Sequence, residues 1–164
     1  MINEKAEWLL LYKKKCRMYF TYESNLKKTE LELEQIIEEI KNVKSVNTTN
    51  IVGHSNKPPE ERLLSLIEIK DELEKQIHYY QSMIKWIFHV NNKVTSPAYR
   101  AITWQTLVQA KNRTDLMINY DVDPDYVCKM RDKFLLVALD KESIQEYQEV
   151  IKIKNKSKWL SLEE

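Results

Sequence analysis

The pattern in the chain that most resembles a chemical site is the acidic run DVDPD, in which Asp121, Asp123 and Asp125 stand at alternate positions. This is the spacing of the first ligands in a calcium-binding loop. Such a loop needs glycine at its sixth position for a sharp turn and a bidentate glutamate at its twelfth. The chain has Tyr126 and Asp132 there. We therefore expect these aspartates to cap a helix and not to bind calcium.

Nucleophiles, metal ligands and phosphate-binding loops are equally sparse. The chain contains one glycine, so neither the G-x-G-x-x-G fingerprint nor the P-loop can be written with it. His78 and His89 stand about three turns apart on one expected helix, too far to share a metal ion. No serine or cysteine stands in a known nucleophile motif. The sequence predicts no enzyme activity, no cofactor and no metal site.

Composition favours an all-α fold, because β-hairpin turns depend on glycine. The 26 Lys and Arg residues nearly balance the 25 Asp and Glu residues, so the chain lacks the strong basic excess of many DNA-binding domains. Cys16 and Cys128 are far apart and form no C-x-x-C pair, which predicts free thiols in a reducing cytoplasm. No apolar run is long enough to span a membrane.

The first element is expected to be one long amphipathic helix over about residues 2–44, a stretch without proline or glycine. Positions at alternating spacings of three and four are mostly apolar, as in a coiled coil. They are Leu9, Tyr12, Cys16, Tyr19, Glu23, Leu26, Glu30, Leu33, Ile37 and Ile40. This seam can pack on the same chain or on a second copy of it, which leaves a homo-oligomer through this arm open.

A second long helix is expected over about residues 60–90, after a polar loop at 45–59 that holds the only glycine. Its apolar stripe also follows heptad spacing, with members Leu63, Leu66, Lys70, Leu73, Ile77, Tyr80, Ile84 and Ile87. Two heptad helices joined by one loop predict a long antiparallel helical hairpin, coiled-coil-like in character. We assign it to residues 1–95.

The sequence predicts a helix-turn-helix module over residues 96–140, because several N-cap patterns, each marking the start of a helix, follow one another closely. The cap patterns are Ser96 before Pro97, Asn112 with Asp115, and Asp123 before Pro124. The last helix is expected from Pro124 to about Leu139, with Asp121 tolerating the left-handed conformation of the turn. A small core is expected from Leu116, Met117, Tyr120, Val122, Val127 and Met130. Three ordinary packed helices are the alternative, and residues 141–164 are expected to be a helical or flexible tail of mixed charge.

The motif PAYR at Pro97–Arg100, the capped helices after it and the polar loop and leucine-periodic helix before it resemble phage late-transcription regulators of the ArpU/RinA type. The resemblance covers residues 46–139. It implies a module like the fourth region of sigma factors, whose last helix reads DNA. It further implies activation of phage late genes through double-stranded promoter DNA, host RNA polymerase or both, and a place in the cytoplasm of the bacterial host.

On that last helix, the side chains expected to bind DNA are Asp125, Tyr126, Lys129, Arg131 and Lys133. Lys129 is expected to reach base edges, while Arg131 and Lys133 flank it and reach phosphates. Asp125 and Asp132 would repel phosphates on the same face, although a carboxylate can accept from cytosine. The weak basic excess keeps a second class of function open. This is a protein-interaction or assembly component, such as a small-terminase-like packaging protein or a coiled-coil adaptor.

Overall fold

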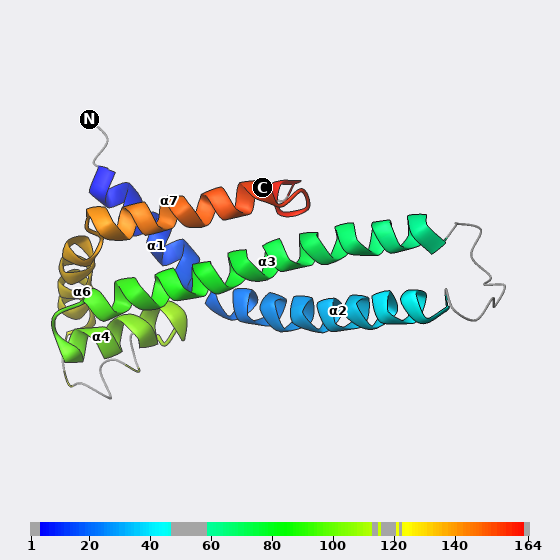
Figure 1. Cartoon of the computed structure of the whole chain (residues 1–164). Coiled ribbons are helices and arrows are strands. Elements are labelled where there is room, and N and C mark those ends of the chain that lie inside the picture. The colour runs from blue at the N-terminus through cyan, green and yellow to red at the C-terminus, as the bar shows by residue number, and fades with distance from the viewer. Residues whose placement is uncertain (1–3, 47–58, 113–114, 116–120, 122, 163–164) are drawn as a thin grey trace. The chain divides into compact units, whose positions relative to one another are not determined.

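A computed structural model describes residues 4–46, 59–112, 115, 121 and 123–162 of the chain (Figure 1). Every regular element among these residues is a helix, so the predicted all-α fold class is confirmed. The elements in chain order are α1 (Glu4–Arg17), α2 (Tyr19–Val46), α3 (Pro59–Lys93), α4 (Pro97–Thr103), the π-helix η1 (Trp104–Val108), α6 (Pro124–Ala138), α7 (Lys141–Lys156) and the 3₁₀-helix η2 (Leu160–Leu162).

Contacts between Cα atoms group the chain into two compact units. Unit 1 comprises Met1–Glu23 and Ser82–Val150, and unit 2 comprises Ser24–Gln81 and Ile151–Glu164. Each unit thus combines segments that are distant in sequence. The predicted boundaries near residues 95 and 140 separate parts that are expected to fold independently. Contacts within the whole chain do not measure whether a part folds independently. The predicted division into arm, module and tail therefore stays a prediction.

The long helix predicted over residues 2–44 is interrupted at Met18. Helix α1 ends at Arg17 and α2 begins at Tyr19, and the Met18 amide N–H donates to the Lys15 carbonyl at 3.1 Å. A bond to the third preceding residue tightens the chain relative to an α-helix. Neither glycine nor proline is present, so helix propensity does not impose the break. The prediction of one uninterrupted helix is wrong, because packing and not local sequence decides this boundary.

Beyond the break, the buried stripe of α2 differs from the predicted seam. Glu30, a predicted member, is exposed, whereas its neighbour Thr29 is buried and donates its hydroxyl to the Asn25 carbonyl at 2.6 Å. A hydroxyl that finds its acceptor within the helix can be buried at little cost. The stripe keeps heptad spacing, and its buried or half-buried members are Tyr22, Leu26, Thr29, Leu33, Ile36, Ile40 and Val43.

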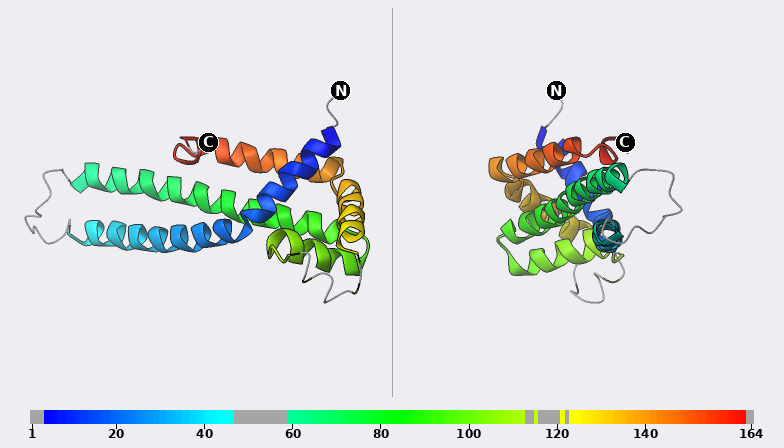
Figure 2. Two further views of the ribbon diagram at one scale, coloured as in Figure 1. Left: turned by 180° about the vertical axis from the view of Figure 1, so that it is seen from behind. Right: turned by 45° about the vertical axis from the view of Figure 1, so that its right-hand side comes forward.

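In unit 2, α2 and α3 lie side by side and antiparallel (Figure 1, Figure 2). Ile40 and Val43 of α2 form a buried cluster with Leu66 of α3, and Ile36 and Leu63 pack against it. These are members of the two apolar stripes, which meet because each stripe covers one face of its helix. The predicted antiparallel helical hairpin is therefore confirmed, and the contacts that build it lie within one chain.

Helix α3 carries two buried stripes, of which sequence analysis identified one. All members of the predicted stripe from Leu63 to Ile87 are buried or half-buried. The second stripe has the same heptad spacing on another face, and all its members are buried: Glu72, Gln76, Tyr79, Met83, Trp86 and Val90. It was missed because Glu72 and Gln76 are residue types that are mostly exposed. A helix with two buried faces needs partners on both. On the second face, Glu72 bonds Ser157 and Trp159 in unit 2, and Trp86 contacts Tyr12 and Tyr147 in unit 1.

The core of unit 1 is built around aromatic rings from three helices. The Trp86 ring of α3 lies 5.6 Å from the ring centre of Tyr12 in α1 and 4.6 Å from that of Tyr147 in α7. The Tyr12 hydroxyl donates to the Ile87 carbonyl at 3.1 Å, and the Trp86 indole N–H donates to the Ser143 carbonyl at 2.9 Å. Buried aromatic polar groups thus have partners. The tail that was expected to be helical or flexible is helical in α7 and helps to form this core.

Candidate nucleic-acid interface

The segment before the predicted DNA-binding helix begins as the sequence predicts. The Ser96 hydroxyl accepts from the Tyr99 amide at 3.3 Å, and Pro97 occupies the first turn of α4. The expected helix to about residue 110 is present in extent, but it changes to π-helical geometry at Trp104. Ala110 then takes a positive φ of 55°. Non-glycine residues rarely adopt this left-handed backbone conformation, and here it ends the helical segment.

The turn chemistry around α6 also agrees with the sequence. Asn112 and Asp115 bond reciprocally, the Asp115 amide to the Asn112 side chain at 3.0 Å and the Asn112 amide to the Asp115 carboxylate at 3.3 Å. Asp121 has a φ of 48°, the left-handed conformation expected of it. The Asp123 carboxylate accepts from the Asp125 amide at 3.2 Å, so the acidic run caps a helix as predicted.

The helix expected between these caps falls largely on residues 113–114 and 116–120, which lie outside the described residues. The same holds for Leu116, Met117, Tyr120 and Val122 of the expected small core. The helix-turn-helix therefore stays a prediction. Its last helix is present as α6, with the start and length that the sequence predicts.

Helix α6 packs through one face within unit 1. Val127 is buried in a cluster with Ile102 of α4, and Tyr99 and Cys128 pack against this cluster. The ring of Phe134 lies 4.9 Å from that of Tyr99. Cys128 thus lies half-buried beside the core. These contacts fix which side of α6 remains at the surface.

Arg131 belongs to the buried face and is 8% exposed. Its guanidinium donates to the Thr106 hydroxyl and to the Asp132 carboxylate, both at 3.0 Å. The other oxygen of Asp132 accepts from Lys13 of α1 at 2.9 Å. Arg131 was expected to flank the DNA-facing stripe, but its charge is directed to partners within unit 1. No sequence signal pairs Lys13 with Asp132, because the two are joined only by packing.

The exposed side of α6 carries the other four predicted site residues. Asp125, Lys129 and Lys133 are exposed, and Tyr126 is 58% exposed. Spacings of three and four residues place Tyr126, Lys129 and Lys133 along one side of the helix. Among the described residues, no carboxylate lies within ion-pair distance of Lys129 or Lys133. We call these four side chains the α6 stripe, and its two lysines can attract phosphate.

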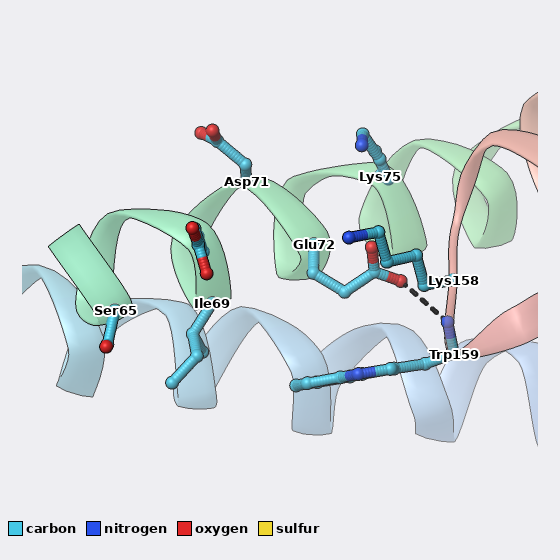
Figure 3. Close-up of a pocket in the computed structure, with 8 residues that line it drawn as sticks. Ser65, Ile69, Asp71, Glu72, Lys75, Lys158 and Trp159 are labelled. Carbon is cyan, nitrogen blue, oxygen red and sulfur yellow. Dashed lines mark hydrogen bonds between the residues drawn. The ribbon is translucent and has the colours of Figure 1, made fainter.

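A separate pocket lies in unit 2, where α3 meets the C-terminal segment (Figure 3). It encloses about 420 Å³ and is lined by Ser65, Glu68, Ile69, Asp71, Glu72, Lys75, Lys158 and Trp159. In Figure 3, Glu72 points toward the C-terminal segment, whereas Asp71 points away from it. The lining combines carboxylates and lysines, so it presents no single charge to a ligand.

Buried Glu72 holds the C-terminal segment against α3 within unit 2. Its carboxylate accepts from the Ser157 hydroxyl and from the Trp159 amide at 3.0 Å. Burial alone would raise the pKa of Glu72. The hydrogen bonds from Ser157 and from the amides of Trp159 and Lys158 outweigh burial and hold this pKa below 4.5. The charged carboxylate is therefore a structural anchor.

Glu72→Gln is expected to destabilise the protein at neutral pH and much less in acid. Because the pKa of Glu72 is lower in the folded state, its contribution is complete above about 4.5 and is lost as the pH falls through the folded-state value. Urea denaturation followed by circular dichroism should show the difference between the two proteins shrinking from about pH 7 to about pH 3. The exposed neighbour Glu68 gives the matched control, since Glu68→Gln should leave stability unchanged. A difference that is constant with pH would contradict the role of the charge.

The two thiols are free and differ in environment. Burial raises the pKa of the Cys16 thiol to about 12, although Tyr12 and the nearby Arg131 act in the opposite direction. Such a thiol is a poor nucleophile, because the thiolate is the reactive form. Within the described ranges, no group of three His, Cys, Asp or Glu side chains is placed to hold a metal ion.

Comparison with known proteins adds no relative. A scan against protein-family models finds no match, and searches of curated proteins and of solved structures find no significant one. The resemblance to phage late-transcription regulators therefore stays a prediction that rests on the sequence. No helix in the described part of the chain is long and apolar enough to cross a membrane.

Proposed function

We propose that the chain binds double-stranded DNA through the α6 stripe and regulates transcription. The observation that carries the proposal is the side of α6 that remains exposed, which presents Tyr126, Lys129 and Lys133. The helix follows a left-handed Asp121 and an Asp123 cap, as the second helix of a helix-turn-helix would. Side chains near the start of such a helix contact base edges in the major groove.

The ion pairs of Asp132 strengthen this proposal. A free carboxylate among the lysines of α6 would repel phosphate. Asp132 instead accepts from both Lys13 and Arg131, so its charge is compensated inside unit 1. Among the described residues, Lys129 and Lys133 near the middle of the helix then have no carboxylate within ion-pair distance, and the acidic Asp125 of the α6 stripe lies at the start of the helix. The polypeptide can therefore present a locally positive surface although its net charge is only +1.

The regulatory role follows the sequence resemblance. In this proposal the protein activates phage late genes in the bacterial cytoplasm by binding promoter DNA, with host RNA polymerase as the protein partner. The α6 stripe supplies the DNA contact, with Lys129 at base edges and Lys133 at a phosphate. Arg131 acts here by positioning α6, since it bonds Thr106 and Asp132.

Variants of the two lysines test the DNA contact. The probes are a fluorescent random-sequence duplex and a duplex enriched by selection against the whole protein, titrated by anisotropy at two salt concentrations. Lys129→Ala should reduce the preference for the selected duplex by about 5- to 150-fold, the range for one base contact. Lys133→Ala should weaken binding to both duplexes alike and lower the salt slope by about 1.

The exposed Lys28 of α2 supplies the control, because Lys28→Ala removes a surface charge far along the sequence from α6. It should leave both affinities and the salt slope unchanged. If Lys129→Ala and Lys133→Ala behave like Lys28→Ala while their helical content is intact, α6 does not bind DNA.

A second candidate function, a protein-interaction or assembly component, is favoured by exposed aromatic side chains in unit 1. Phe20 and Phe88 are exposed, and their rings adjoin those of half-buried Tyr19 and Trp104. Tyr19 and Trp104 contact each other at 4.9 Å, which makes one continuous aromatic patch. Such patches often mark protein contacts. Light scattering separates the two functions, because a packaging protein should form a ring of many subunits and a regulator a monomer or dimer.

A further inference from the structure

A groove beside the C-terminal half of α6 lies in unit 1. It encloses about 250 Å³ and is lined by Lys93, Thr95, Met130, Lys133, Phe134 and Val137. We call it the α6 groove. Four of these residues lie on α6, and Lys93 and Thr95 belong to the end of α3 and the link to α4. The Phe134 side chain is fixed by its ring contact with Tyr99.

The floor of the α6 groove is apolar and open to solvent. Met130, Phe134 and Val137 form it, and Val137 is 70% exposed. Methionine adapts its shape to different apolar partners. Val137 thus adds an exposed apolar side chain next to those of Met130 and Phe134. The volume is suited to one bulky apolar side chain, not to a large cofactor.

The charges at the rim of the groove differ in their partners. Lys93 bonds Asp140 at 3.0 Å and the Ser143 hydroxyl at 2.9 Å, and lies 3.8 Å from Glu142. Its charge is therefore compensated. Lys133 has no carboxylate within ion-pair distance among the described residues. The groove thus offers an apolar floor beside one uncompensated positive charge.

We infer that the α6 groove binds an acidic segment of a partner protein, which places one bulky apolar side chain on Met130, Phe134 and Val137 and a carboxylate beside Lys133. Charge complementarity selects this partner, because a basic segment would be repelled by Lys133. Nucleic acid is a poorer match, since its phosphates make no use of an apolar floor. The inference goes beyond the proposed DNA contact and does not require it.

The test uses the full chain and two short synthetic helical peptides, each with a central phenylalanine. One peptide carries glutamates four residues to either side of it, and the other carries lysines there. Isothermal titration calorimetry should show the acidic peptide binding at least about tenfold more tightly than the basic one. Lys133→Glu should reverse this preference, because the charge at the rim changes sign.

Variants of Val137 test whether the peptide binds in the α6 groove or elsewhere on the surface. Val137→Asp should weaken the acidic peptide by about tenfold or more, and Val137→Ala should weaken it less. Leu64 of α3, 60% exposed, is the matched control, and Leu64→Asp should leave peptide affinity unchanged. Val137→Ala should also leave affinity for the random-sequence duplex unchanged, so that failure of the groove and failure of DNA binding are told apart.

The inference is overturned if neither peptide binds, if both bind equally, or if the folded Val137 variants bind the acidic peptide as the parent does. Circular dichroism shows whether each variant is folded. Val137 is largely exposed, so its replacement should not disturb the fold.

Discussion

Replacement of Trp86 by alanine is expected to lower the free energy of unfolding by about 3–5 kcal/mol, the usual cost of removing a buried tryptophan. Trp86 is fully buried, and its ring contacts Tyr12 and Tyr147 from two other helices of unit 1. The variant leaves a large cavity and removes the indole N–H that donates to the Ser143 carbonyl. Urea denaturation followed by far-ultraviolet circular dichroism measures the loss.

Two further variants show where this loss comes from. Trp86→Phe keeps most of the ring volume but removes the N–H donor, so it should cost less than Trp86→Ala. Trp159→Ala removes the same side chain from a site that is 47% exposed, and should cost well under half as much. If Trp86→Ala proved as mild as Trp159→Ala, the aromatic core of unit 1 would not be the main source of stability there.

Asp132→Asn is expected to destabilise the protein by about 2–3 kcal/mol. Breaking a buried ion pair costs about 3–5 kcal/mol because one charge stays buried without its partner. We expect a loss of only about 2–3 kcal/mol because the Asp132 side chain is 29% exposed, so water screens part of its interaction with Arg131. The unpaired charge would be that of Arg131, whose side chain is 9% exposed. Chemical denaturation of the purified variant measures this change.

A second substitution tests whether the buried charge is the cause. Arg131→Met in the Asp132→Asn background removes the guanidinium and keeps an apolar chain of similar length. The double variant should be more stable than Asp132→Asn alone, since replacing a whole buried pair is often neutral. A further loss of stability would mean that Arg131 acts mainly through packing. Glu142→Gln is the control, because its carboxylate is 86% exposed and its pair with Lys93 should contribute little.

This second prediction also bears on the proposed DNA contact. From the sequence, Asp132 was expected on the face proposed to meet DNA, where its removal should strengthen non-specific binding. The structure gives Asp132 two cationic partners, so Asp132→Asn removes two ion pairs within unit 1 as well as a charge. The DNA affinity of that variant is therefore interpretable only alongside its stability, whereas Lys129 and Lys133 can be changed without this complication.

The sequence alone determined the features that depend on neighbouring residues. The caps at Ser96 and Asp123, the reciprocal bonds of Asn112 and Asp115 and the left-handed Asp121 are local, and all were predicted. Heptad spacing predicted the α2–α3 hairpin because an apolar stripe must be covered. The exposed positions of Tyr126, Lys129 and Lys133 also agree with the helix that the sequence placed at 124–139.

Only the tertiary structure decided the features that depend on distant residues. The break at Met18 has no glycine or proline to mark it. Burial of Glu72 depends on Ser157 and Trp159, and burial of Arg131 depends on Thr106 and Asp132. A polar residue can be buried once a partner satisfies it, and that partner is unknown until the chain has folded. For this reason the second stripe of α3 and the position of Arg131 were visible only in three dimensions.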